Sequence, residues 1–436
     1  MEELIPVLDW IGLVLVALAL IGSAILVLVA IRMAYSLRTH LATRREAMAV
    51  EARLLAYPLP PDDGLPHIVV QIPVFNEGTV VERAIRACAA LDWPKAKLHI
   101  QVCDDSNDET TALARAAAQV AAAAGIDCTV VHREDRSDFK AGALRDAMAQ
   151  TNHDYFAILD ADYVPPPDFL RRCMAALLAE PKLAFVQARP DFLNARLNMF
   201  TRAQAIILDY HYGIEQTIRS WSGPAVPFNG TCGIWRRAAI EAGGGWRGDT
   251  LTEDWDLTYR ALLKGWRGMF MVTVTAPGEL PARPGAWFSQ QKRWATGVGQ
   301  VAWKMLPNLL FNHTLSGSAR WGAMSPLVTW LGYLSFSATV LLAVAAMLFR
   351  PSIALMLGLT VYVAVVVLAI ALFVLMLAAN RFLRPSTRVT SFLVDFPAAL
   401  ALSAYVSWAN LQSLPATLAG RHRVFIRTPK QGSVTM

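Results

Sequence analysis

Two groups of carboxylates in this chain have the residue types and spacing of a chemical site. Asp160 and Asp162 form a D-x-D pair, and the stretch TLTEDWDL at residues 250–257 contains Glu253 and Asp254. Hard divalent cations prefer carboxylate and phosphate oxygens as ligands, and a carboxylate beside a reacting hydroxyl group is a sufficient general base. We therefore predict that Asp160 and Asp162 bind Mn²⁺ or Mg²⁺, and that Asp254 is a catalytic base oriented by Glu253.

Each of these patterns also has a simpler interpretation. A lone D-x-D sequence is more often a turn or a helix cap, and a cluster of acids is more often solvated surface. The chemical interpretation gains weight because Asp160 and Asp162 directly follow a β-rich run. In an extended segment, alternation would point both side chains to the same side, toward one cation.

Other residues predict contacts to a phosphorylated nucleotide. Asp104 and Asp105 follow a second β-rich run, and Glu77 follows a third. A carboxylate in such a place can accept hydrogen bonds from a nucleobase or a ribose, whereas Lys140 can pair with a phosphate oxygen.

The segment FSQQKRWATG, residues 288–297, predicts a further part of the site. Helical spacing puts Gln290, Arg293 and Trp294 on one face. Arg293 can stabilise a departing diphosphate, and Trp294 offers a flat surface on which a sugar ring can stack. The simpler alternative is an amphipathic helix at a membrane surface.

An alternation of strands and helices has to position these residues. β-rich runs predict strands at 67–74, 97–109 (running into acids), 128–134, 154–164 and 184–190, and helical patterns lie at 79–90 and 137–150. Ser106 and Glu109 form an S-x-x-E capping box in front of an alanine-rich helix. This order predicts an α/β fold with a doubly wound sheet, in which ligands bind beyond the carboxyl ends of the strands.

Long uncharged segments predict membrane-spanning helices on both sides of the α/β region. Residues 10–31, 321–349 and 351–380 contain no charged residue and are long enough to cross a bilayer. Arginines follow the first segment, so the positive-inside rule puts the α/β region in the cytosol. We expect an integral protein of the inner or plasma membrane, divided into 1–54 (helix and basic linker), 55–297 (α/β domain), 298–320 (interfacial or ordinary surface helix), 321–420 (membrane region) and 421–436 (basic tail).

The segment 391–420 is harder to interpret, because Asp395, Pro397 and Pro415 interrupt it. It is a single span, a re-entrant hairpin, or a span followed by an interfacial helix. A single crossing would put the basic tail outside, against the charge rule. We therefore expect this segment to cross the membrane twice or not at all.

The composition agrees with a membrane protein and limits its partners. The chain has 436 residues, of which 55% are hydrophobic and 17% charged, and its mean hydropathy is +0.36. The net charge of +6 suits membrane lipids and phosphate ligands, but no dense Lys/Arg stretch is interleaved with aromatic residues, which argues against nucleic acid. The five cysteines are scattered and no Cys/His cluster is apparent, so we expect reduced thiols and no zinc site.

The order of these motifs resembles that of the membrane-bound, inverting family-2 glycosyltransferases, which have the GT-A fold. The match runs through DD at 104–105, DAD at 160–162, TED at 252–254 and QQKRW at 290–294. The intervening sequence is similar to the cellulose-synthase-like A group, the mannan and glucomannan synthases, and their bacterial relatives. The resemblance covers roughly residues 65–300.

The resemblance implies transfer of a hexose from a nucleotide sugar, UDP-glucose or GDP-mannose, to a growing β-linked polysaccharide. It implies that Asn229 and Gly230, in the stretch FNGT, lie near the acceptor. It also implies the roles already assigned to the acidic motifs and to QQKRW. Lys292 and Cys232 differ from the residues that plant mannan synthases tend to show, which leaves linkage and acceptor open.

Three functions remain in competition. A polysaccharide synthase would pass its product between its membrane helices, where aromatic residues either line the path or anchor the helices at the interface: Trp303, Tyr333, Phe336, Tyr405 and Trp408. A lipid glycosyltransferase would add one sugar to diacylglycerol or ceramide. A non-catalytic scaffold would only bind nucleotide sugar, but such a protein does not need Asp254.

Overall fold

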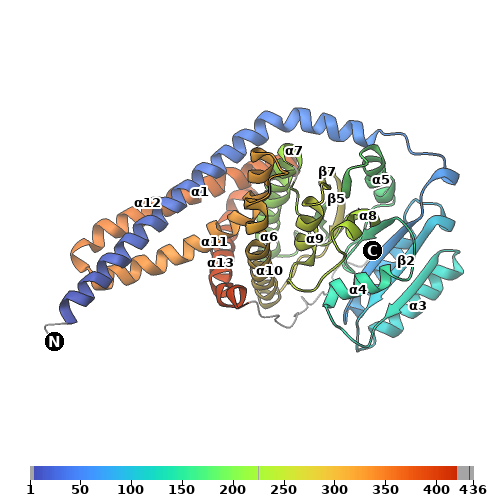
Figure 1. Cartoon of the computed structure of the whole chain (residues 1–436), viewed down its shortest axis with the longest axis horizontal. Helices are drawn as coiled ribbons and strands as arrows, with labels where there is room; N and C mark the ends of the chain where they lie inside the picture. Colours follow the sequence, from blue (N-terminus) through green and yellow to red (C-terminus); the bar gives the residue numbers. More distant parts are fainter. Residues whose placement is uncertain (1–3, 224, 420–431, 433–436) are drawn as a thin grey trace.

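The computed structural model describes residues 4–223, 225–419 and 432 of the chain. It contains an α/β domain and a group of long helices that extend away from it (Figure 1). The basic tail expected at 421–436 therefore lies, except for Gly432, outside the described residues.

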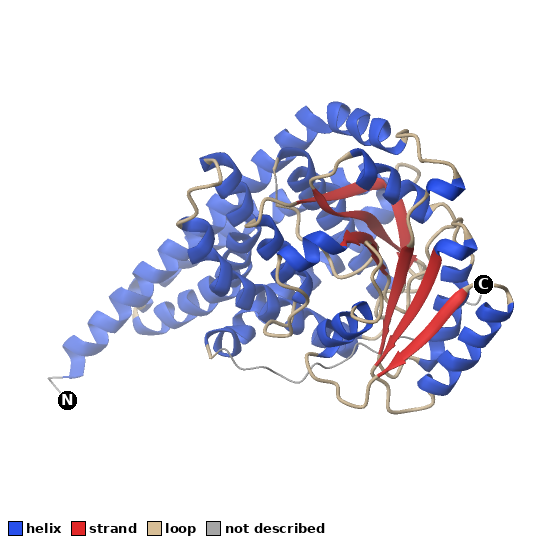
Figure 2. Cartoon of the chain, turned by 45° about the vertical axis from the view of Figure 1, so that its right-hand side comes forward, coloured by secondary structure: helices blue, strands red, loops and turns tan. Residues whose placement is uncertain are grey.

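The α/β domain is built on a seven-stranded mixed sheet in the order β3-β2-β1-β4-β6-β5-β7 (Figure 2). β6 is antiparallel to β4 and β5, and the other neighbouring strands are parallel. Their bounds are β1 (Ile68–Val74), β2 (Leu98–Asp104), β3 (Asp127–His132), β4 (Tyr155–Ile158), β5 (Leu183–Phe192), β6 (Gly233–Arg236) and β7 (Arg267–Gly278).

Helices cover both faces of this sheet, so its central strands are buried on both sides and read as continuous apolar runs. Along β1, Val70 and Ile72 belong to one core and Val69 to the other. The first core receives α2 (Gly78–Ala89), α3 (Thr110–Ala123) and α5 (Phe169–Ala179), and the second receives α4 (Phe139–Met148), α8 (Arg237–Ala242) and α9 (Glu253–Leu262). The predicted doubly wound α/β fold is confirmed.

Two local predictions were wrong. α3 begins at Thr110 and has no side-chain cap of the expected kind, because the Ser106 hydroxyl instead accepts the N–H of Asn76 at 2.8 Å. β4 ends at Ile158, so Asp160 and Asp162 lie in a turn and not in an extended segment. Both acids nevertheless stay at the carboxyl end of a central strand.

The helices that follow the fifth strand connect the α/β domain to the membrane region. α6 (Met199–Tyr210) continues through a π-helical turn (His211–Gln216) into α7 (Thr217–Ser222). α10 (Pro284–Leu310) is one continuous helix that carries the QQKRW motif and crosses the boundary expected at residue 297.

Among the described residues, four helices are long and apolar enough to cross a membrane: α1 (Leu4–Leu55), α11 (Gly317–Phe349), α12 (Ala354–Leu383) and α13 (Val389–Leu418). α1 runs unbroken through the stretch expected to be a basic linker. It packs along α11 and α12, and the three helices extend together to the left in Figure 1.

α13 is a single continuous helix, which excludes a double crossing, one of the two arrangements expected for this segment. The other arrangement, in which the segment does not cross the membrane, stays a prediction. α13 packs chiefly against α10, α6 and α11, and in Figure 1 it runs across the direction of α1, α11 and α12. Its Asp395 carboxylate is buried. Both carboxylate oxygens accept the same Nε–H of Arg202 on α6, at 3.0 and 2.9 Å. This ion pair satisfies the charge that interrupts the apolar segment.

Candidate active site

Twelve predicted site residues from distant parts of the chain line one cavity of about 1040 Å³. The cavity lies beyond the carboxyl ends of β1 and β4, between these strand ends, α9 and α10. The twelve are Glu77, Asp105, Lys140, Asp160, Asp162, Asn229, Gly230, Glu253, Asp254, Gln290, Arg293 and Trp294. Asp104 is the one predicted residue that does not line it.

Lys140 connects three parts of the cavity. Its Nζ donates to Asp160 Oδ1 at 2.5 Å and to the carbonyl oxygen of Gly230 at 2.8 Å. Burial alone would lower the pKa of Lys140, but the carboxylates of Asp160, Glu253 and Asp254 outweigh burial and raise it. The amine is therefore a fixed positive charge in the middle of an acidic cavity.

The D-x-D pair fits a divalent cation by the chemistry of its donors. Asp162 is buried, and its Oδ2 accepts the N–H of Glu279 at 3.1 Å, whereas the Asp160 side chain is 37% exposed. Two carboxylates completed by substrate phosphates are a usual arrangement for Mg²⁺ or Mn²⁺. Such an ion would compete with Lys140 for the Asp160 carboxylate.

Asp254 lies in the first turn of α9. Its Oδ1 accepts the N–H of Trp255 at 2.9 Å, so the helix N-terminus fixes the orientation of the carboxylate. Burial and the neighbouring Glu253 carboxylate raise the pKa of Asp254 to about 8, against the opposing effects of the Trp255 amide and Lys140. A carboxylate whose pKa lies near the working pH is well suited to take up a proton.

Gly230 brings the backbone against this carboxylate. Its φ is +75°, and a Cβ atom built there would lie 3.1 Å from Asp254 Oδ2 and 3.6 Å from Lys140 Nζ. A larger residue would be strained by its backbone and would fill the space beside the base. Glycine at this position keeps that space open for a ligand.

Asp256, the third acid of TLTEDWDL, has a structural role. Its side chain is fully buried and pairs with Arg260 Nε and Lys304 Nζ, each at 2.7 Å. The charge that makes this stretch unusual in sequence is therefore divided: Glu253 and Asp254 face the cavity, and Asp256 holds α9 to α10.

Replacing Asp256 by Asn is expected to lower the free energy of unfolding by about 3–5 kcal/mol, because two cations lose their buried partner. Thermal unfolding in detergent measures the loss. The matched control is Asp249→Asn: Asp249 also pairs with Lys304, at 2.6 Å, but its side chain is 46% exposed, so we expect a loss of under about 1 kcal/mol. Equal shifts for the two variants would contradict this assignment.

Asp104 is held inside the protein. Its side chain is fully buried, and its carboxylate accepts the N–H of Ser106 at 3.0 Å and the hydroxyl of Thr111 at 2.6 Å, while His132 Nδ1 lies 2.9 Å away. These contacts fix the end of β2 and the loop after it. Asp104 thus positions its neighbour and is not exposed to a ligand in this structure.

Asp105 lines the cavity, and Arg133 holds it in a two-pronged ion pair, with Nε and Nη2 each 2.8 Å from a carboxylate oxygen. Arg136 lies nearby and stacks on the Phe75 ring, 3.3 Å from its centroid. Phe75 and Arg136, which we did not predict, also line the cavity and give it a flat, positively charged wall.

The QQKRW residues enter the same cavity from α10, as their helical spacing predicts. Gln290, Arg293 and Trp294 all line it. Burial lowers the pKa of Arg293, and the carboxylates of Glu253 and Asp160 oppose this effect. Because the pKa of an arginine side chain normally lies far above neutral pH, the Arg293 guanidinium stays charged beside the acids despite this lowering.

Gln187, in the middle of β5, was also missed. It is fully buried; its Oε1 accepts the side-chain N–H of Asn229 at 3.0 Å, and its Nε2 donates to the Thr231 carbonyl at 2.8 Å. The Thr231 hydroxyl in turn accepts the N–H of Asp160 at 2.9 Å. Gln187 is a polar residue inside the apolar run AFVQARP. Because buried polar groups require hydrogen-bond partners, its presence there could have indicated a contact to the site.

The cavity continues from the acids to the long helices. Its lining includes Tyr333 and Phe336 of α11, two of the five aromatic residues suggested for a product path. The other three do not line it: Trp303 and Trp408 are exposed, and Tyr405 packs on Phe288, with ring centroids 4.1 Å apart.

Comparisons with known proteins show the family of the chain. A family model described as glycosyltransferase-like family 2 matches residues 66–297, more than half of the chain. The chain belongs to this family. The matched region contains all twelve predicted residues that line the cavity.

Plant enzymes are among the similar proteins. Glucomannan 4-beta-mannosyltransferase 7 of Arabidopsis thaliana is 39% identical over 260 residues, which cover 59% of this chain and 47% of the relative. Glucomannan 4-beta-mannosyltransferase 1 of Oryza sativa subsp. japonica is 40% identical over 265 residues, covering 58% of this chain and 51% of the relative. This family-2 glycosyltransferase thus spans about half the length of the curated relatives it matches.

A solved structure supports the fold. A mannosyltransferase from Pyrobaculum calidifontis, determined in complex with GDP-mannose and Mn²⁺, superimposes with a TM-score of 0.52 and 21% identity. The match covers 90% of this chain and 98% of the other. The expected GT-A architecture of the α/β domain is therefore confirmed.

Proposed function

We propose that this family-2 glycosyltransferase is an inverting β-mannosyltransferase that moves mannose from GDP-mannose to a growing β-linked polysaccharide. One observation carries the proposal: the cavity that contains the paired acids, Lys140 and Arg293 is continuous with the space between the long helices. The choice of mannose rests on the names of the plant relatives and on the ligand in the structure of the Pyrobaculum calidifontis mannosyltransferase.

The cavity residues have complementary roles in the proposed reaction. Asp254 takes the proton of an acceptor hydroxyl as its oxygen attacks the anomeric carbon of the donor. The bond from that carbon to the diphosphate breaks on the opposite side, which inverts the configuration. Lys140 and Arg293 neutralise the departing diphosphate. A Mn²⁺ or Mg²⁺ ion held by Asp160 and Asp162 would supply further charge neutralisation there.

The remaining residues bind and orient the reactants. Asp105 and Glu77 face the nucleotide, and Asp104 positions Asp105 from inside the fold. Trp294 offers a stacking surface to the acceptor sugar. The acceptor side also includes three polar or backbone contacts, from Gln290, Asn229 and Gly230.

We propose a topology of three spans, α1, α11 and α12, with α13 lying along the cytosolic surface of an inner or plasma membrane. The crosswise packing of α13 on α10 and α6 supports this arrangement. It also removes the conflict found in the sequence. Two crossings after the α/β domain return the chain to the cytosolic side, where the positive-inside rule puts the basic residues after α13.

A second candidate is transfer of a single sugar to a membrane lipid such as diacylglycerol or ceramide. The membrane end of the cavity favours it, because Leu28 and Val29 of α1 and Leu372 and Met376 of α12 line that end. These apolar side chains suit an acyl chain as well as a passing polymer.

The product decides between the two candidates. Membranes that contain the protein are supplied with Mn²⁺ and labelled GDP-mannose or, separately, labelled UDP-glucose. We expect label from GDP-mannose in an ethanol-insoluble pellet that a β-mannanase releases. Label in the organic phase would identify a glycolipid and overturn the polymer proposal. Label from UDP-glucose alone, released by a β-glucanase, would overturn the choice of sugar.

The pKa of Asp254 leads to a prediction for the pH profile. The carboxylate is the active form of the base, so kcat/KM should rise with pH, by about tenfold per unit below about 8, and level off above it. Glu253→Gln removes the neighbouring charge that raises this pKa and should move the profile to lower pH. A profile that stays flat between pH 6 and 9 would contradict the assignment.

A further inference from the structure

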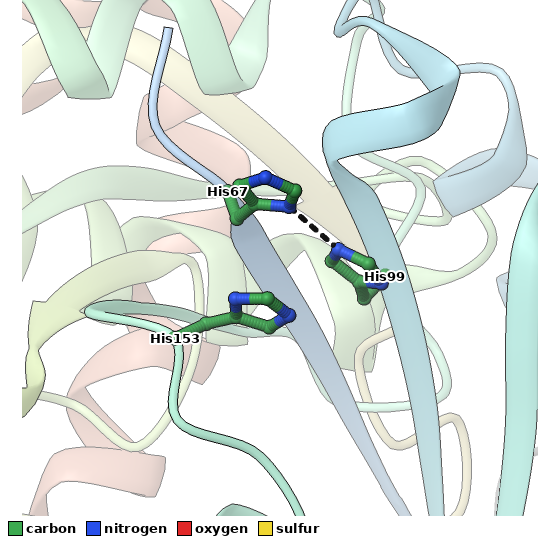
Figure 3. A group of neighbouring side chains, drawn as sticks. All are labelled: His67, His99 and His153. Atoms are coloured by element: carbon green, nitrogen blue, oxygen red, sulfur yellow. Dashed lines mark hydrogen bonds between the residues drawn. The ribbon is translucent and has the colours of Figure 1, made fainter.

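A cluster of three histidines lies at the edge of the sheet opposite to the active site (Figure 3). His67 immediately precedes β1, His99 is the second residue of β2, and His153 lies two residues before β4. β1 is the shared neighbour of the other two strands, and the parallel register pairs Ile68 with both Leu98 and Tyr155. The amino-terminal ends of three adjacent strands therefore bring the histidines together.

The three rings are close and nearly parallel. His67 Nδ1 lies 2.9 Å from His99 Nε2, and one ring nitrogen of each histidine lies within 4.8 Å of the others. The His153 ring stacks on His67 and His99, with centroids 4.8 and 4.3 Å apart. Zinc–nitrogen bonds of about 2.0–2.1 Å in a tetrahedral site need nitrogens ~3.3 Å apart. To reach that spacing, the stacked His153 ring has to rotate and its nitrogen has to move by about 1–2 Å.

Asp127 of β3 orients one ring. Its Oδ2 lies 2.8 Å from His99 Nδ1, an arrangement in which the carboxylate accepts the Nδ1–H. The lone pair of His99 Nε2 then points toward His67, and a proton on His67 Nδ1 bridges the two rings. A histidine whose second nitrogen donates to a carboxylate is the usual form of a metal-bound imidazole.

The surroundings of His67 and His153 favour the neutral imidazole, which is the form that binds metal. Burial lowers the pKa of His67 and His153, as do the neighbouring histidines, Lys97 beside His67 and Arg237 beside His153. Asp154 opposes this effect at His153. The cluster remains open on one side, since His67 is exposed and the other two are partly buried.

We propose that His67, His99 and His153 form a binding site for a borderline transition-metal ion, with Zn²⁺ the first choice, and that Asp127 supports it from behind. Imidazole ligands suit Zn²⁺, Cu²⁺ and Ni²⁺, whereas the acids of the active site suit Mn²⁺ and Mg²⁺. The bound ion takes the place of the proton between His67 and His99: the proton on His67 Nδ1 moves through solvent to Nε2 of the same ring, which stays neutral, and water completes the coordination of the ion. The ion connects β1, β2 and β4 at their amino-terminal ends, opposite to the carboxyl ends where the active site lies.

No such site is apparent in the linear sequence, where these histidines are 32 and 54 residues apart. We expected no zinc site because no Cys/His cluster is visible in the linear sequence. Parallel strands bring residues that are distant in sequence to the same edge of the sheet. For this reason the linear sequence did not reveal the cluster.

Titration with Zn²⁺ tests the proposal. The full chain is purified with a histidine-free tag, placed in lipid nanodiscs and stripped with EDTA, and calorimetry measures binding. We expect one Zn²⁺ per chain, a higher melting temperature with Zn²⁺, and at least about tenfold weaker binding in His153→Asn and His67→Asn. The matched control is His313→Asn, because His313 is an exposed histidine in the loop between α10 and α11.

Two further variants separate this site from a fold defect and from the active site. Asp127→Asn keeps all three ligands and should weaken Zn²⁺ binding about 10–100-fold. Asp160→Asn, in the active site, should leave Zn²⁺ binding unchanged. The absence of saturable binding, or equal affinity in the wild type, His153→Asn and His67→Asn, would overturn the proposal.

Discussion

Replacing Asp254 by Asn is expected to lower kcat by about 10²–10⁴-fold, the contribution of a positioned general base. The amide is nearly the same size and can still accept the N–H of Trp255, so α9 should keep its first turn. Asn cannot take up the proton of the acceptor hydroxyl. Loss of the base should therefore appear in the chemical step and not in the binding of the donor.

Two measurements identify the cause of that loss. Mannosyl transfer is followed in membranes, and binding of GDP-mannose is measured on the purified variant, where we expect an unchanged Kd. Asp249→Asn is the matched control, because Asp249 lies near α9 but outside the cavity lining. Full activity in Asp254→Asn would refute the assignment of the base. Binding of GDP-mannose without any transfer in the wild type would favour the scaffold alternative.

The sequence predicted the sheet and the place of the site because both depend on local patterns. Continuous apolar runs such as IVVQIPV are typical of strands buried on both faces, and β1 is buried along its whole length. Once the strands were known, acids at their carboxyl ends had to meet at one edge of the sheet. The positions of Asp105, Asp160 and Glu77 follow from this rule.

The roles of individual acids were less predictable, because they depend on partners far away in sequence. Asp104 and Asp105 are neighbours, yet one is enclosed by Thr111 and His132 and the other faces the cavity. Asp256 is distinguished from Asp254 by Lys304, 48 residues later. Sequence spacing shows which acids are near a site, but only the packing of neighbouring elements decides which of them a ligand can reach.

The membrane region shows a related limit. Hydropathy locates apolar helices but does not show whether a helix crosses the membrane or lies along its surface. The segment at 391–420 was therefore open to several interpretations. The structure makes it one helix, and the Asp395–Arg202 pair joins it to α6. Asp395, the charged residue that interrupts the apolar sequence, therefore forms an ion pair that holds α13 to the α/β domain.

Removal of divalent cations is expected to lower transfer at least about a hundredfold, because a cation at a departing diphosphate supplies several kcal/mol of stabilisation. Lys140 and Arg293 do not replace it, since both are already close to the charges of Asp160 and Glu253. Initial rates in EDTA, followed by addition of Mn²⁺ or Mg²⁺, measure the effect.

Two variants connect this loss to the D-x-D pair. Asp162→Asn should bind Mn²⁺ more weakly, so that the Mn²⁺ concentration needed for half-maximal rate rises while the protein stays folded. His153→Asn changes only the histidine cluster at the opposite edge of the sheet, so its requirement for Mn²⁺ should equal that of the wild type. Full activity in chelator would show that Asp160 and Asp162 hold no ion that matters to transfer. A requirement for Mn²⁺ that changed in His153→Asn but not in Asp162→Asn would place the essential ion at the wrong edge of the sheet and contradict the proposed site.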